Sequence, residues 1–256
     1  MHRFLAGIFA GALVLSCVSR AGAQTPPSIR VDGQVALASL ESLCDDHLRS
    51  VLGGLDALAA TPGARGANWT QIESPLRALA EGLDLTAAVW FADRGGAIWT
   101  VGRGRQSVRI ADRPYFSRLL QGRQVVGDLV VSRTTGKAVA IVAVPILDAS
   151  GKTIGALGAS VDLARLSAEL KREMNVGAGN IFFSIDSSGV VGITMTPGYI
   201  MRGSRSISPE FHAAFAQMLQ HDAGTVTYSL GGVKRIVIYR KSPFTGWRYA
   251  FGIVTP

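Results

Sequence analysis

The sequence predicts an α+β protein in which a long N-terminal helix is followed by two antiparallel-sheet subdomains. Apolar residues recur three or four positions apart between residues 32 and 60, which is the spacing of an amphipathic helix. Beyond residue 85, short apolar segments alternate with glycine-containing turns, and this pattern occurs twice. With 256 residues, 48% of them hydrophobic, the chain can bury one large core or two modest ones.

The first 23 residues have the features of a signal peptide. Arg3 precedes an apolar run over residues 4–18, and Ala21-Gly22-Ala23 forms a small-x-small cleavage site. The run is too short to span a bilayer comfortably, since a spanning helix takes about 20 residues. An alternative interpretation makes Cys17 the acylated first residue of a lipoprotein. Both interpretations predict a protein that is periplasmic or secreted.

Charge and cysteine content narrow the classes of partner. The formal charge is +8, and removal of the two arginines of the leader leaves about +6, which favours an anionic partner. Nine basic residues fall between residues 94 and 137, although a solvated face is the alternative interpretation. Export and the lack of a recognised motif argue against nucleic acid. After cleavage only Cys44 remains, so no intrachain disulfide is possible, and we expect Cys44 to be a core residue.

Residues 32–83 are predicted to form a helical region that packs on the sheets. The first helix runs from Asp32 to Ala60 and ends at Thr61-Pro62-Gly63. Asn68 and Gln71 can cap a second, shorter helix. The apolar stripe of the first helix needs a partner. Packing against the sheets is favoured over dimerisation, because both faces of the sheets need cover.

Residues 85–162 are predicted to form the first subdomain, a five-stranded antiparallel sheet with helices on one side. Residues 102–105 are expected to be a loop, and residues 117–121 a single helical turn. The five predicted strands are 87–91, 97–101, 127–132, 137–145 and 153–162.

A connecting helix is predicted within residues 163–176, and the second subdomain occupies residues 177–256. The second subdomain repeats the strand and turn pattern of the first at a nearly constant offset, which argues for two copies of one fold. Three pairs of turn residues give offsets of 93, 97 and 95 positions: Asp93 with Asp186, Gly127 with Gly224, and Gly151 with Gly246.

Arg113 is the leading candidate for a ligand contact, because its paired guanidinium donors match a carboxylate. Tyr115 and Phe116 can supply a pocket wall. Asp112 can orient Arg113 or cap the helix that Pro114 opens, and the cap is favoured. The alternative interpretation places both aromatic residues in the core and Arg113 in a structural ion pair.

The predicted site has four further members. Asp162 ends a long apolar strand at a position that can border a pocket, although an aspartate before a helix is more often its N-cap. Trp99, Ser132 and Thr134 are candidate lining residues, as is Trp90, with core or turn positions as the alternative. The four histidines are scattered, and the sequence contains neither metal-ligand spacing nor a nucleophile motif. We therefore expect no metal, no cofactor and no catalysis.

Several short segments occur in a characteristic order over residues 32–170: Ser107 to Phe116, Gly127-Asp128, Thr135-Gly136-Lys137, Val144-Pro145, Asp148 to Gly151, and Gly155-Ala156-Leu157. In order and spacing they resemble the Cache family of extracytoplasmic sensor domains. Gly246-Trp247 is the clearest matching feature of the second copy. The resemblance implies a double Cache domain, with a long helix, two PAS-like subdomains and the ligand usually in the first, membrane-distal pocket.

The resemblance also implies roles for individual residues. In relatives that bind amino acids, an Arg-x-Trp-Tyr segment and a later Asp hold the carboxylate and amine of the ligand. Arg113 matches that arginine and Asp162 the aspartate, whereas Tyr115 and Phe116 stand where Trp and Tyr would be. This departure leaves small carboxylates open as ligands.

The functional hypothesis is an exported sensory protein that binds a small carboxylate or amino-acid-like metabolite. Because the chain stops at Pro256 directly after a strand, we expect the signal to pass to a membrane receptor or histidine kinase, as in chemotaxis or two-component signalling. The alternative is a ligand-free module that dimerises through its first helix and modulates such a receptor or kinase.

Overall fold

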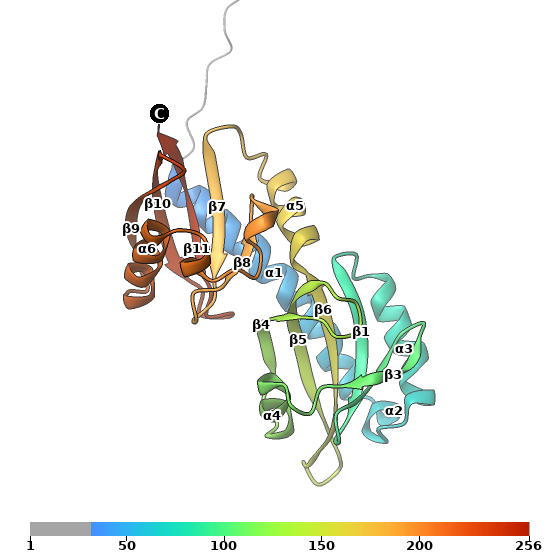
Figure 1. The fold of residues 1–256 in the computed structure, drawn as a ribbon. Helices are drawn as coiled ribbons and strands as arrows, with labels where there is room; N and C mark the ends of the chain where they lie inside the picture. Colours follow the sequence, from blue (N-terminus) through green and yellow to red (C-terminus); the bar gives the residue numbers. More distant parts are fainter. Residues whose placement is uncertain (1–31, 256) are drawn as a thin grey trace, which may run out of the picture. The chain divides into compact units, whose positions relative to one another are not determined.

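The computed structural model describes residues 32–255; the predicted signal peptide, its cleavage site and Cys17 lie outside them. The first element is α1 (Gly33–Ala59), drawn in blue in Figure 1. Asp32 caps α1 by accepting a hydrogen bond from the Gln34 amide at 2.7 Å. The apolar stripe is confirmed, since its members are buried at helical spacing: Leu37, Leu40, Cys44, Leu48, Val51 and Leu55.

The remaining helices are short and connect or cover the strands. They are α2 (Pro62–Arg65), α3 (Trp69–Glu81), α4 (Pro114–Leu120), α5 (Leu163–Glu173), α6 (Pro209–Gln220) and the single 3-10 turns η1 (Pro197–Tyr199) and η2 (Ser204–Ser206). No helix between residues 32 and 255 is long and apolar enough to cross a bilayer.

The first sheet has six strands rather than the five predicted. They are β1 (Thr86–Asp93), β2 (Ala97–Thr100), β3 (Gly104–Arg109), β4 (Val125–Val131), β5 (Ala138–Leu147) and β6 (Thr153–Asp162). Their order is β3-β2-β1-β6-β5-β4, with every pairing antiparallel. The extra strand is β3, which begins inside the predicted loop. It is a half-exposed edge strand of mainly polar residues, so it lacks the apolar alternation on which the prediction depended.

Helices cover both faces of this sheet, so the prediction of a single covered face is wrong. Side chains alternate along β1, and Phe91 belongs to the core cluster that includes α1. Its neighbour Trp90 belongs to a second cluster on the other face, together with Tyr115 and Phe116 of α4. Because both faces of the sheet are apolar, α4 is needed opposite α1.

The second sheet repeats the first. Its strands are β7 (Asn180–Ile185), β8 (Val191–Thr194), β9 (Ala223–Leu230), β10 (Val233–Lys241) and β11 (Arg248–Thr255). Their order, β8-β7-β11-β10-β9, corresponds to β2-β1-β6-β5-β4 in the first sheet. The predicted internal repeat is therefore confirmed, and β3 is an addition to the first copy.

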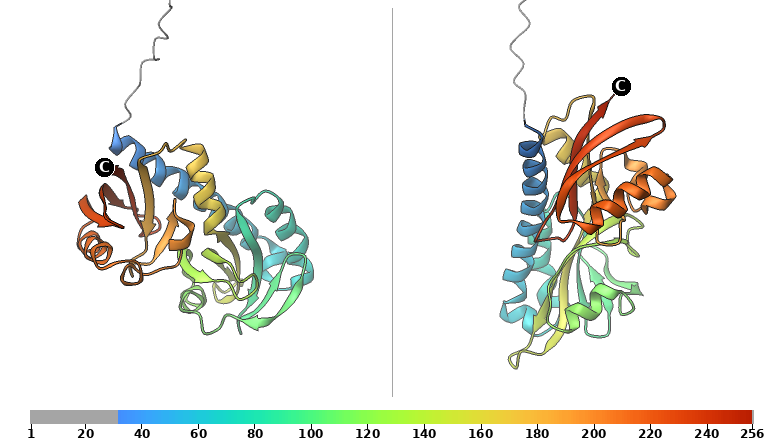
Figure 2. Two further views of the ribbon diagram at one scale, coloured as in Figure 1. Left: turned by 45° about the horizontal axis from the view of Figure 1, so that its top comes forward. Right: turned by 90° about the vertical axis from the view of Figure 1, so that its left-hand side faces the viewer.

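α1 packs on both sheets, as the prediction had it (Figure 2). It contacts β5 and β6 of the first sheet and β10 and β11 of the second, and one apolar cluster holds side chains from all three. Asp45 of α1 accepts hydrogen bonds from Ser242 Oγ at 2.5 Å and from the Tyr249 hydroxyl at 2.8 Å. Trp247 Nε1 donates to the Gly127 carbonyl of β4 at 2.9 Å and thereby joins the two sheets.

Candidate ligand-binding site

A small cavity lies on the face of the first sheet that carries Trp90, beside α4. Its volume is about 20 Å³. We call it the Arg113 cavity. Strands, the segment before α4, α4 itself and the β4–β5 turn contribute its lining residues, which are Trp90, Ile98, Ile110, Arg113, Tyr115, Val130, Val131, Ser132, Arg133, Thr134, Ile141 and Ser160.

The floor of the cavity is the indole of Trp90. Its Nε1 donates to Ser160 Oγ at 3.3 Å, so the buried N–H has a partner. The ring lies over Gly158 of β6, where a Cβ atom would come within 2.2 Å of the indole. Glycine at this position is what allows a tryptophan to lie against the strand.

Tyr115 forms a wall. Pro114 occupies the first turn of α4, where its missing amide costs no hydrogen bond, and places Tyr115 next to it. The ring is buried, yet its hydroxyl makes no side-chain hydrogen bond to any residue between 32 and 255. Burial raises the pKa of Tyr115 to about 12, against the opposing effect of the Arg113 and Arg133 charges. The hydroxyl is therefore protonated at neutral pH and can donate to an anion.

Two arginines stand at the mouth of the cavity. Arg113 Nη2 donates to the Val131 carbonyl at 2.9 Å. Arg133 donates from Nη1 and Nη2 to the Asp112 carboxylate, both at 2.7 Å, and from Nη1 to the Arg109 carbonyl at 2.6 Å. The hydrogen bonds from Arg133 lower the pKa of Asp112 to about 2. The mouth therefore carries two guanidinium groups and one carboxylate.

Two hydroxyl groups complete the rim. Ser132 Oγ lies 3.1 Å from Thr134 Oγ1, and it also accepts a hydrogen bond from the Thr135 amide at 3.3 Å. Gly136, with φ of 71°, closes the turn before Lys137. Residues 132–137 thus form the hairpin turn that their sequence predicts. The hydroxyls of this turn line the same cavity as Arg113 and Arg133.

Comparison with known families assigns the fold. The family model described as Cache domain matches residues 19–255. The chain belongs to the Cache family. Together with the two repeated sheets and the long first helix, this match confirms the double Cache architecture that the sequence resembles. A search of curated proteins finds no match.

Solved structures share this Cache fold at low sequence identity. The extracellular domain of the histidine kinase rpHK1S-Z16 has a TM-score of 0.73 at 18% identity, with 87% of this chain and 92% of that one covered. The ligand-binding domain of the Pseudomonas aeruginosa chemoreceptor PctB, in complex with L-Arg, gives 0.65 at 13%, covering 87% and 91%. An extracellular ligand binding receptor from Desulfohalobium retbaense gives 0.71 at 14%, covering 88% of this chain and 41% of that one. At these identities the likeness shows the fold alone.

Four of the seven predicted site residues of this Cache domain line one cavity, namely Arg113, Tyr115, Ser132 and Thr134. Phe116 does not; it is a buried residue of α4 and belongs to the core cluster on this face. Trp99 lies on the other face of the sheet, where its ring centroid is 5.4 Å from that of Phe91. Strand alternation explains the difference, since Trp99 is paired with Phe91, whereas Trp90 points to the cavity.

Asp162, the seventh predicted residue, caps α5. It accepts hydrogen bonds from the Ala164 and Arg165 amides at 3.1 and 3.2 Å, so the N-cap interpretation is confirmed. Its Oδ2 also accepts from Lys137 Nζ at 2.7 Å. Burial raises the pKa of Asp162, but Lys137 and the two amides outweigh burial and bring the pKa below its usual value. Both carboxylate oxygens therefore already have donors within the protein.

Sequence reasoning missed two polar groups of the cavity and misplaced a third. Arg133 was counted only among the basic residues of the region, and Ser160 only as part of an apolar strand. The period of two along β6 could have placed Ser160 on the same face as Asp162. Asp112 does not cap α4, because Arg113 holds the N-cap position without a side-chain bond; Asp112 pairs with Arg133 instead.

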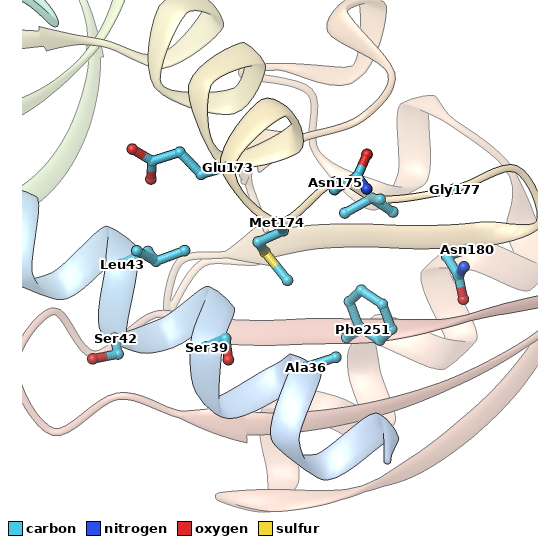
Figure 3. Close-up of a pocket in the computed structure, with 11 residues that line it drawn as sticks. Ala36, Ser39, Ser42, Leu43, Glu173, Met174, Asn175, Gly177, Asn180 and Phe251 are labelled. Carbon is cyan, nitrogen blue, oxygen red and sulfur yellow. The ribbon is translucent and has the colours of Figure 1, made fainter. Parts of the chain in front are cut away.

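A larger groove lies between α1 and the segment after α5 (Figure 3). Its volume is about 690 Å³. In Figure 3, Met174 and Phe251 lie across from Ser39 and Ser42 of α1. None of its lining residues is buried, and Glu173 is the one charged residue among them. Since polar groups do not converge on this groove, we place the candidate site at the Arg113 cavity.

Proposed function

We propose that this Cache protein is an exported sensory protein that binds a small carboxylate in the Arg113 cavity and signals to a membrane receptor or histidine kinase. The observation that carries the proposal is the convergence of two guanidinium groups and the Tyr115 hydroxyl on one cavity. A guanidinium offers paired donors that match a carboxylate. We propose binding without chemical turnover, because the guanidinium and hydroxyl groups of the lining are suited to holding an anion.

The Lys137–Asp162 ion pair supports a carboxylate over an amino acid. A ligand ammonium needs an acceptor, and Asp162 is the residue that resemblance would assign to that task. Its carboxylate is already held by Lys137 Nζ and two backbone amides. The ammonium group of Lys137 thus occupies the acceptor that the ammonium group of an amino-acid ligand would need. PctB, whose structure is a complex with L-Arg, has 13% identity with this chain, which leaves room for a different ligand.

Ligand entry requires the mouth to open, because about 20 Å³ is smaller than any organic acid. Arg113 is held by a single hydrogen bond to the Val131 carbonyl. The Arg133–Asp112 pair is exposed on both sides, and such pairs contribute little to stability. A ligand carboxylate can therefore replace the Val131 carbonyl as the acceptor for Arg113 at small cost.

The same strand offers a route for the signal. Val131 ends β4, and Gly127 of β4 accepts the hydrogen bond from Trp247 of the second half of the protein. Release of Val131 by Arg113 alters the end of a strand whose middle is fixed to the second sheet. We propose that displacement of β4 relays occupancy to the second sheet, from which a partner reads it.

Calorimetric titration of the purified protein against paired acids tests the proposal. Lactate and L-alanine are a suitable pair, since lactate carries a hydroxyl group where L-alanine carries an ammonium group. A short organic acid is expected to bind, with its amino-acid counterpart at least about tenfold weaker, a difference of about 1.4 kcal/mol. Arg113→Ala should abolish binding at this cavity. Arg123→Ala is the matched control, because among residues 32–255 the Arg123 side chain hydrogen-bonds only to Gln121 and does not line the cavity. Acid binding that is unchanged in Arg113→Ala would refute the site.

The small volume of the Arg113 cavity also favours a second candidate function. A cavity filled by side chains is what a ligand-free interaction module would have. In that case the protein would modulate a receptor or kinase through its surface. Capture of such a partner by wild-type protein and by Arg113→Ala alike, with no acid bound in titration, would establish this alternative.

A further inference from the structure

A second cavity lies in the second sheet, at the place that corresponds to the Arg113 cavity. It is lined by residues of β7, β8, β9 and β10 and by residues of η1 and α6, and its volume is about 100 Å³. We call it the Tyr228 cavity. A water molecule takes about 30 Å³ of liquid volume, so this space admits a small molecule without movement of the sheet.

The body of the cavity is aromatic. The ring centroid of Phe211 in α6 lies 5.0 Å from that of Tyr228, 5.8 Å from Phe183 and 6.3 Å from Tyr199. The Phe211 ring is tilted against each of the other three, and all four residues line the cavity. A ligand with a short hydrocarbon body would displace water from aromatic surface there, which is favourable.

One end of the cavity is polar. Tyr228 is 6% exposed, and its hydroxyl makes no side-chain hydrogen bond to any residue that the structure describes. Burial raises the pKa of Tyr228, against the opposing effect of the Arg235 charge, so the hydroxyl is a neutral donor. This hydroxyl therefore has a proton that it can donate to an acceptor in the cavity.

Arg235 stands beside this hydroxyl. Tyr228 and Arg235 are directly paired between β9 and β10, so both side chains lie on the cavity face. Arg235 Nη1 donates to the Leu230 and Val233 carbonyls at 2.7 and 2.8 Å, which fixes the guanidinium on the hairpin. Its Nε and Nη2 have no acceptor among residues 32–255, so they remain available to a ligand.

We propose that the Tyr228 cavity is a second binding site, for a monocarboxylate with a short apolar body. The ligand carboxylate accepts from Arg235 Nη2 and the Tyr228 hydroxyl, and its alkyl chain lies against Phe211. An organic cation, which aromatic rings alone would suit, is disfavoured by the charge of Arg235. This site does not depend on the proposed function of the Arg113 cavity.

Propionate and isobutyrate are the probes, titrated calorimetrically in the Arg113→Ala background so that the first cavity is silenced. Arg235→Gln is expected to weaken binding at least about tenfold, and Tyr228→Phe several-fold, because the ring stays and only the hydroxyl is lost. Lys234→Gln is the matched control, an exposed residue next to Arg235 whose substitution should leave affinity unchanged.

Crystals soaked with 3-bromopropionate give a second readout, since the bromine should lie among the four aromatic rings. Binding that Arg235→Gln and Tyr228→Phe leave unchanged would overturn the proposal. So would the binding of tetramethylammonium in place of the acids, or the absence of acid binding in the Arg113→Ala background. Failure of the Arg113 site is seen separately, as the absence of lactate binding in Arg235→Gln protein, whose Arg113 cavity is intact.

Discussion

Replacing Asp45 with alanine removes the acceptor that joins the middle of α1 to the second sheet. Asp45 is 5% exposed, and Ser242 and Tyr249 are fully buried. A buried donor left without a partner costs about 1–3 kcal/mol. Ser242 keeps part of its bonding, because its Oγ still accepts from the Phe244 and Thr245 amides. We therefore expect the free energy of unfolding to fall by about 2–4 kcal/mol, measured by urea denaturation.

The pH dependence gives this prediction a second check. Burial raises the pKa of Asp45, and the hydrogen bonds from Ser242 and Tyr249 oppose that effect only in part. The folded state then keeps a proton that the unfolded state has released, so stability falls as pH rises from the unfolded pKa through the folded one. The difference in unfolding free energy between wild type and the non-titrating Asp45→Asn should accordingly be largest in acid and shrink towards neutrality.

Asp46→Ala is the control for both measurements, because Asp46 is exposed and, within the described residues, its side chain hydrogen-bonds only with Ser42. It should change the unfolding free energy by less than about 0.5 kcal/mol. The reasoning is refuted if Asp45→Ala costs no more than this control, or if the difference between wild type and Asp45→Asn is constant with pH.

Two further predictions concern the first sheet. Gly158→Ala places a Cβ atom 2.2 Å from the Trp90 ring, so it should lower the unfolding free energy by about 1–3 kcal/mol and shift tryptophan emission. Gly177→Ala, which meets nothing within 4 Å, should do neither. Lys137→Met frees Oδ2 of Asp162, so affinity for L-alanine should rise relative to lactate; unchanged selectivity would contradict the role given to the ion pair. The lowered pKa of Asp162 stabilises the fold above its unfolded pKa, and this contribution is lost as pH falls through the folded value, so Lys137→Met should flatten the acid limb of stability.

Periodicity in the sequence was sufficient for most of the fold. The stripe of α1 and the repeated turns are set by local burial and by backbone geometry, which residue types record directly. The strand β3 was not predicted, because an edge strand does not need an apolar face. The helix cover on the second face was not predicted, because α4 is short. The burial of α4 depends on contacts with Trp90 and other residues of the sheet rather than on the length of the helix.

The candidate site was predictable where it follows from one segment. Arg113 and Tyr115 belong to the segment from Ser107 to Phe116, and the β4–β5 turn has a recognisable turn sequence of its own. The partners of Asp112 and Asp162 were not predictable, because Arg133 and Lys137 reach them through pairing of strands and turns that are distant in sequence. The face on which Trp99 lies depends on the register between β1 and β2. A shift of one residue in that register would move Trp99 to the opposite face of the sheet.

The apolar cluster shared by α1 and the two sheets couples the stability of both halves. Phe91 of the first sheet, Phe182 of the second and the buried side chains of α1 belong to the same cluster. Neither sheet can lose its packing on α1 without exposing apolar surface of the other. A ligand that binds the native state at either cavity therefore raises a common melting temperature. Melting curves will therefore report that a ligand is bound, but not at which cavity. Variants of the Arg113 and Tyr228 cavities are needed to assign the binding to one half of the protein.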